Sequence, residues 1–128
     1  MGSFEDKDKI YKEKFLAFGV RMVKLKKFLN TEKHEYCLAD QILRSGTSIG
    51  ANHREAIYAE SDSDFVHKLA VSQKECSETL YWLDLLYAAE YIDEKQYKSL
   101  YEDAEEIMKM LTSSILSAKK KLTEKTNQ

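Results

Sequence analysis

Four long segments of the chain carry apolar residues at helical spacing, and short polar breaks separate them. In each segment the apolar positions recur three or four residues apart, which places them on one stripe of an α-helix. The first two segments cover about residues 8–29 and 35–60. The third runs from a polar cluster at 61–63 to about Tyr91, and the fourth from Asp93 to about Leu122. Short loops make consecutive helices antiparallel, so the pattern predicts an all-α fold, an antiparallel up-down-up-down four-helix bundle.

The residues at two of the breaks favour helix starts. Ser61, Asp62 and Ser63 carry short side-chain oxygens that can accept a hydrogen bond from a free N–H of the first helical turn. Asp93 and Gln96 have the spacing of a capping box, in which two residues cap each other. We predict a single domain over residues 1–128, with frayed ends at about 1–7 and 123–128.

Composition narrows the class of protein. The chain has 128 residues, of which 43% are hydrophobic and 33% charged, and it contains no proline and four glycines. This composition fits one globular helical domain rather than a strand-and-turn architecture. No apolar run approaches the ~20 residues of a membrane span, and the first residues do not resemble a signal peptide. We therefore expect a cytoplasmic protein without membrane contact, in which Cys37 and Cys76 are free thiols.

The second segment is unusual because its centre is poor in helix formers. Gly46 and Gly50 each cost about 1 kcal/mol relative to alanine inside a helix. Close approach of a neighbouring helix would offset that cost, since small residues let two backbones come near each other.

A polar line follows the same segment. If the chain folds back near Ser61, Arg44 faces Glu78 and Ser48 faces Glu75 on the third helix. A buried arginine needs a carboxylate partner, so we predict a core polar network. Its members are Arg44, Ser48, Asn52, Glu75 and Glu78. Two interpretations stay open: the network fixes the register of the two helices, or its charged groups form a functional site.

These residues also carry a family resemblance. The stretch 41–52, with Arg54, Glu55 and Ala56, resembles the second-helix signature of a bacterial four-helix-bundle family named for the intervening sequences of 23S ribosomal RNA genes. Residues 74–86, 91 and 92 resemble its third helix, and Phe65 fits the aromatic residue near the start of that helix. The likeness covers about residues 15–116. His53 departs from it, because an aliphatic residue is common at this position.

The resemblance implies a bundle that assembles as a ring, often a pentamer. The chain is also similar to the accessory protein of diversity-generating retroelements, a basic pentameric bundle that binds nucleic acid and a reverse transcriptase. For most members of the family no activity is established, so the family name records a gene location rather than a reaction.

Apolar residues outside the core stripes point to a contact surface. They are Leu16, Val20 and Val23 in the first segment and Tyr81 and Leu85 in the third. Exposed apolar patches usually mark interfaces, so we predict a homo-oligomer that uses these residues. The alternative is that they only cover the ends and loops of the bundle.

The charge is uneven although the whole chain carries only −2. Residues 4–33 hold nine Lys or Arg and five acidic residues, a net charge of +4, while residues 62–91 have a net charge of −4. An up-down bundle would place the end of the fourth helix beside the start of the first. We predict weak RNA or DNA binding at a basic edge made of Lys12, Lys14, Lys119, Lys120 and Lys121. The alternative is that these lysines serve only solubility and the helix dipole.

Little in the sequence indicates catalysis. A di-metal bundle needs several Glu residues and Glu-x-x-His motifs, whereas this chain offers only Asp64 and His67 at that spacing. A phosphate-binding loop and an activated cysteine are also missing. We expect no catalytic residue, metal or cofactor. Two functions remain open: a weak nucleic-acid-binding module, or a scaffold that assembles a protein partner.

Overall fold

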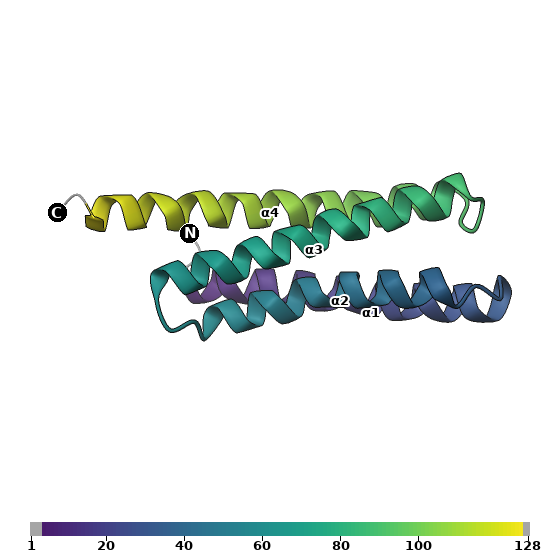
Figure 1. Ribbon diagram of the computed structural model, residues 1–128, viewed down its shortest axis with the longest axis horizontal. Coiled ribbons are helices and arrows are strands. Elements are labelled where there is room, and N and C mark those ends of the chain that lie inside the picture. The colour runs from purple at the N-terminus through teal and green to yellow at the C-terminus, as the bar shows by residue number, and fades with distance from the viewer. Residues whose placement is uncertain (1–3, 127–128) are drawn as a thin grey trace.

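The computed structural model describes residues 4–126 and contains four α-helices over that range (Figure 1). They are α1 (Phe4–Glu32), α2 (Cys37–Ile57), α3 (Asp62–Ala88) and α4 (Glu94–Thr126). Consecutive helices run antiparallel, and both chain ends lie at the same end of the molecule. No strand occurs among the described residues. The predicted all-α, up-down-up-down bundle is therefore confirmed.

Both predicted helix starts are confirmed by their hydrogen bonds. Ser61 Oγ accepts the N–H of Asp64 at 3.1 Å, which caps α3. Asp93 Oδ1 accepts the N–H of Gln96 at 2.7 Å, and Gln96 Oε1 accepts the N–H of Asp93 at 2.9 Å. The second pair is the reciprocal capping box that the spacing predicted for α4.

The helix ends differ from the prediction in several places. Residues 4–7 and 123–126, where we expected fraying, belong to α1 and α4, while residues 1–3 and 127–128 lie outside the described part. α2 ends at Ile57 rather than near residue 60. The N–H groups of Tyr58 and Ala59 donate hydrogen bonds to the carbonyls of Glu55 and Ala56, three residues earlier, instead of continuing the α-helical pattern.

α3 ends at Ala88 because Glu90 adopts the left-handed conformation, with φ of 66°. The N–H of Glu90 bonds to the carbonyl of Tyr87 at 3.0 Å, and the N–H of Tyr91 bonds to that of Leu86 at 2.9 Å. This pair of hydrogen bonds closes the helix as a Schellman motif. Tyr91 therefore belongs to the turn and not to the helix.

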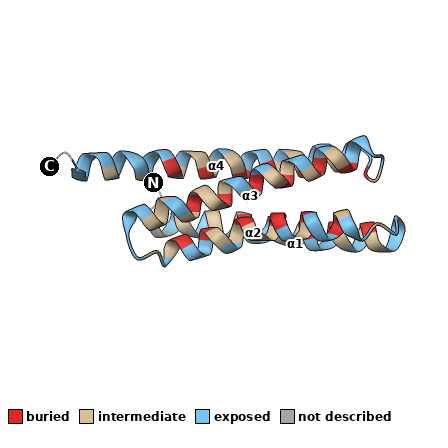
Figure 2. Cartoon of the chain, in the orientation of Figure 1, coloured by how far each residue is buried: buried red, intermediate tan, exposed pale blue. Residues whose placement is uncertain are grey.

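Each helix contributes one buried stripe to a continuous core (Figure 2). The stripes follow the spacing of three and four residues that the sequence showed. The largest completely buried apolar side chains are Phe18, Met22, Leu29, Ile42, Ile49, Leu69, Leu83, Leu86, Ile107 and Leu111.

Gly46 is the position where a small residue is required. A Cβ atom added there would lie 2.4 Å from Cγ and 2.6 Å from Sδ of Met22, which is completely buried on α1. Gly50 is less constrained, because its Cβ would stand 3.4 Å from Cβ of Phe15. Close approach of α1 to α2 thus accounts for Gly46 in the middle of a helix.

The seam between α1 and α4 is polar. α1 and α4 approach each other closely at fewer places than consecutive helices do, and long side chains bridge them. Lys14 Nζ lies 3.3 Å from Asp103 Oδ1 and 2.8 Å from Glu106 Oε2, and Arg21 Nη1 lies 2.6 Å from Asp103 Oδ2. The hydroxyl of Tyr11 donates to the backbone carbonyl of Met110 at 3.2 Å. We call this set of contacts the α1–α4 seam.

Candidate functional site

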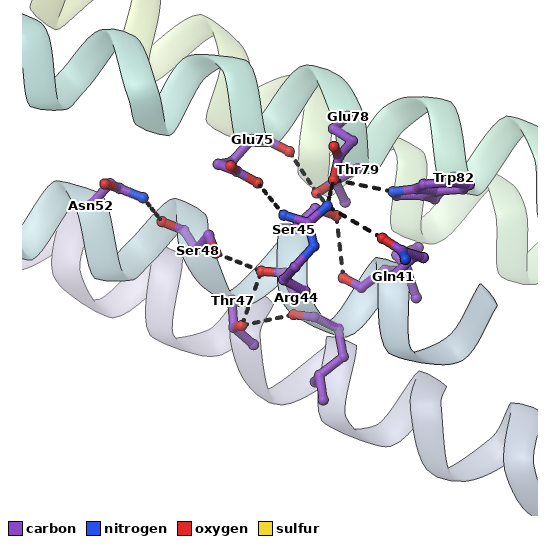
Figure 3. A network of polar contacts seen from close by, with 12 residues as sticks. Gln41, Arg44, Ser45, Thr47, Ser48, Asn52, Glu75, Glu78, Thr79 and Trp82 are labelled. Carbon is purple, nitrogen blue, oxygen red and sulfur yellow. Dashed lines mark hydrogen bonds and ion pairs between the residues drawn. The ribbon is translucent and has the colours of Figure 1, made fainter. Parts of the chain in front are cut away.

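Arg44 on α2 reaches two carboxylates of α3 (Figure 3). Its Nη1 lies 3.3 Å from Glu75 Oε2, and its Nη2 forms an ion pair with Glu78. Trp82 Nε1 also donates to Glu78 Oε2, at 3.3 Å. Arg44 therefore contacts both carboxylates that the antiparallel arrangement of the second and third helices brings opposite it.

The prediction that this network lies in the core is wrong. The side chain of Arg44 is 49% exposed, because it extends outward across the surface of the α2–α3 pair and leaves its charged group in water. Ser48 and Asn52 do not join it. Ser48 Oγ donates to the carbonyl of Arg44 at 2.6 Å, and Asn52 Nδ2 donates to the carbonyl of Ser48 at 2.8 Å. The predicted network is thus a surface ion pair beside two local hydrogen bonds.

Three other polar residues lie completely inside the α2–α3 interface. Thr79 Oγ1 is 2.8 Å from Ser45 Oγ, and Ser72 Oγ donates to the carbonyl of Ile49 at 2.7 Å. The spacing of the sequence places all three on the apolar stripes of α2 and α3, which accounts for their burial. A small hydroxyl residue at such a position is buried, whereas a residue beside the stripe, such as Arg44, is not.

A groove of about 1000 Å³ runs between α1 and α2. Its apolar wall on α1 is the line Leu16, Val20 and Val23, whose side chains are 46–63% exposed. Its other residues include Gly19 from α1, Thr47, Gly50, Ala51 and Arg54 from α2, and Tyr58, which directly follows α2. We call this feature the α1–α2 groove.

The predicted interface residues form two separate surfaces. Leu16, Val20 and Val23 share the α1–α2 groove, whereas Tyr81 and Leu85 belong to α3, which does not pack against α1 in the described residues. Tyr81 is exposed, with its ring 5.2 Å from that of Trp82, and Leu85 is half-buried. One chain therefore has two separate exposed apolar surfaces, one on α1 and one on α3, and these two helices do not pack against each other in the described residues.

His53 lines the α1–α2 groove and is only 6% exposed. Its ring meets the ring of Phe15 edge-on, with 4.7 Å between centroids. Burial lowers the pKa of His53. The negative charge of Asp8 opposes this effect, and the positive charges of Lys12 and Arg54 reinforce it. The imidazole is therefore neutral at pH 7.

The five lysines of the predicted basic edge do not form one cluster. Lys12 pairs with Asp8 at 3.4 Å, and Lys14 is held by two carboxylates in the α1–α4 seam. Lys14 contacts Glu106, which precedes Lys119 by more than three helical turns, so these lysines are separated by about 20 Å along the bundle. Only Lys119, Lys120 and Lys121 are neighbours, and all three are exposed.

Other chemistry at the described residues is limited. Burial raises the pKa of the Cys76 thiol to about 12, so Cys76 is protonated at neutral pH and is not an activated nucleophile. Within residues 4–126, no group of three or more His, Cys, Asp or Glu side chains is arranged to hold a metal ion. No described helix is both long and apolar enough to cross a membrane.

The fold defines an up-down four-helix-bundle protein. Its exposed apolar residues and its three consecutive lysines lie on the surface of the bundle. A family model described as 23S rRNA-intervening sequence protein matches residues 7–113, and the chain belongs to this family. This confirms the resemblance seen in helices α2 and α3. The likeness to the accessory protein of diversity-generating retroelements stays a prediction.

A solved structure from Bacteroides thetaiotaomicron VPI-5482 is also similar to the chain. It is a protein with unknown function from the S23 ribosomal protein family. The two share 53% sequence identity over 85% of this chain and 97% of the other, with a TM-score of 0.84. No curated protein matches the chain.

Proposed function

We propose that this protein is a non-enzymatic helical bundle that assembles with copies of itself into a scaffold. The observation that carries the proposal is the exposed line Leu16, Val20 and Val23 along the α1–α2 groove. Covering a Leu or Val side chain completely contributes about 1.5–3 kcal/mol, so burying this line offsets part of the cost of association.

The two apolar surfaces of the chain support a head-to-tail contact. If the line on α1 packs against the surface of a second copy that contains Tyr81, each subunit uses two unlike faces. Unlike faces generate a ring when the rotation closes. The opposite net charges of residues 4–33 and 62–91 favour this pairing of α1 with α3. A pentamer is the ring that the family resemblance implies.

Light scattering coupled to gel filtration tests the assembly. We expect the native chain to have a multiple of its monomer mass at micromolar concentration, and Leu16→Gln together with Val20→Thr to shift it toward monomer. Leu116→Gln is the matched control, since Leu116 on α4 is 64% exposed, like Leu16 at 63%, but lies outside the groove. A monomeric native chain would contradict the proposal.

Lys119, Lys120 and Lys121 favour a second function, weak binding of nucleic acid. These lysines are consecutive and exposed in the last turns of α4, and no carboxylate of the described residues pairs with them. A ring would repeat this short basic segment, so weak phosphate contacts would become multivalent. Lys12 and Lys14 contribute less, because carboxylates already hold them.

Fluorescence anisotropy with single-stranded RNA and duplex DNA at low salt tests this second function. We expect binding that weakens steeply with salt and that is lost when residues 119–121 are changed to glutamine. Changing Lys24, Lys27 and Lys95 to glutamine removes the same charge from other exposed positions and should have little effect. Absence of binding near roughly 100 μM, the weak end of nonspecific affinities, would eliminate nucleic acid and leave a scaffold for a protein partner.

A further inference from the structure

The α1–α2 groove contains a histidine without a hydrogen-bond partner. His53 is more than nine-tenths buried, yet no described residue donates a hydrogen bond to its ring or accepts one from it. Its nitrogens are not among the completely buried, unsatisfied atoms, so solvent still reaches them. His53 also lines the groove, and water in the groove is therefore what hydrates the ring of the free subunit.

The charged groups around His53 act in both directions on a positive ring, so burial is the main reason that the ring is neutral. α1 contributes Asp8 and Lys12, which pair with each other at 3.4 Å, and α2 contributes Arg54, which has no ion pair among the described residues. Further charged residues line the same groove: Glu55, Glu60, Asp64 and Lys68. Glu55 is 3.9 Å from Lys68, and α4 contributes no residue to the groove. Asp8 thus favours a protonated His53, Lys12 and Arg54 oppose it, and no carboxylate of the described residues is hydrogen-bonded to the ring.

We propose that a second copy of this chain covers the α1–α2 groove and that this contact forms only while His53 is neutral. The inference rests on the proposed self-assembly, since the wall of the groove is the line Leu16, Val20 and Val23 that we assign to the interface. A covering subunit removes the water that hydrates His53. A neutral ring edge-on to Phe15 tolerates that loss, whereas an imidazolium without an acceptor does not.

The consequence is an assembly that dissociates at low pH. Each contact between two subunits forms only when one His53 has lost its proton. The dissociation constant of that contact should therefore rise about tenfold for each pH unit below the pKa of His53 in the free subunit. In a ring every contact contains one His53, which makes the loss of the complete assembly steeper than the loss of one contact.

The experiment measures mass by sedimentation velocity at pH 8, 7, 6 and 5.5, with circular dichroism of the same samples. The variants are His53→Gln and His53→Leu, of which the second places an apolar side chain beside Phe15 and keeps the test valid if the first fails to fold. The matched controls are His34→Gln and His67→Gln, because both of these histidines are exposed and lie outside the groove. We expect the dissociation constant of the native chain and of both controls to rise between pH 6.5 and 5.5 while the chain remains helical, and that of the His53 variants to stay constant.

The outcomes separate the two proposals. A native chain that is monomeric at pH 8 overturns the self-assembly itself. A native chain that is assembled at pH 8 and equally assembled at pH 5.5 overturns only the role of His53. The same conclusion follows if the His53 variants dissociate together with the native chain, or if loss of helicity accompanies the loss of mass.

Discussion

Arg44 contacts two carboxylates but keeps half of its side chain in water. Ion pairs at this exposure contribute little, because solvent screens them and holding long side chains costs entropy. We expect Arg44→Ala to lower the free energy of unfolding by less than about 1 kcal/mol, measured by urea denaturation. Lys74→Ala, at an exposed lysine of α3 for which the described residues show no ion pair, is the control. A loss of several kcal/mol would mean that Arg44 is buried in solution.

We expect opposite effects on the free energy of unfolding when two different glycines are replaced by alanine. Gly46→Ala would push a methyl group into the buried Met22 and should lower the free energy of unfolding by about 1–3 kcal/mol. Gly19→Ala meets nothing within 4 Å, so its better helix propensity should raise that energy by up to about 1 kcal/mol. Thermal unfolding of both variants at low protein concentration checks the pair. Equal effects would contradict the close approach at Gly46.

At the scale of single residues, the sequence predicted which side chains contact each other better than it predicted which side chains are buried. The fold-back of two antiparallel helices fixes which residues face each other, which is why Arg44 could be matched with Glu75 and Glu78. Whether a long side chain points inward depends on its angular position, and Arg44 lies beside the stripe rather than on it. The buried hydroxyls of Ser45 and Thr79 occupy stripe positions, which accounts for their burial.

At the scale of single helices, Glu90 ends α3 in a conformation that glycine prefers. Its φ of 66° places a side chain in the left-handed region, where a Cβ atom costs about 1–2 kcal/mol. Glu90→Gly should therefore raise the free energy of unfolding by up to about 1 kcal/mol, since glycine also loses more entropy on folding. Glu90→Ala keeps the Cβ atom and should give no such gain. Denaturant midpoints of the two variants make the comparison.

Helix starts were easier to predict than helix ends for a physical reason. A start depends on specific side-chain oxygens, and those of Ser61 and Asp93 are visible in the sequence. The end of α3 depends on a backbone conformation that Glu90 adopts without a glycine to signal it. The apolar pattern continues to Ile92, which is buried in the core after the turn, so periodicity alone extended the helix too far.

At the scale of the whole molecule, the α1–α4 seam links stability to pH. Burial raises the pKa of Asp103, but its contacts with Arg21 and Lys14 lower the pKa by more, so the value lies below the usual one. Asp103 therefore contributes stability at neutral pH that is lost as pH falls below about 4. We expect Asp103→Asn to cost stability at pH 7 and much less at pH 3, measured by urea denaturation. Glu102→Gln, at an exposed carboxylate of the same helix, should show no such difference.

The basic edge could not be located from the sequence, because it depends on this seam. The order of helices correctly places the end of α4 near the start of α1. The register between α1 and α4 is set by side chains far apart in the chain, and it puts Lys14 opposite Glu106 rather than beside Lys119. For the α1–α2 groove, the sequence indicated only the apolar line on α1. It did not show that His53 lies in the same groove.

The polar seam also bears on how the bundle forms. Packing between consecutive helices needs only short loops, and such local contacts are made early during folding. Arg21 and Asp103 are 82 residues apart, so bringing them together costs more loop-closure entropy than joining consecutive helices. Contacts made after the transition state slow unfolding and leave the folding rate almost unchanged. We therefore expect the α1–α4 seam to affect how long a folded molecule survives more than how quickly it is made.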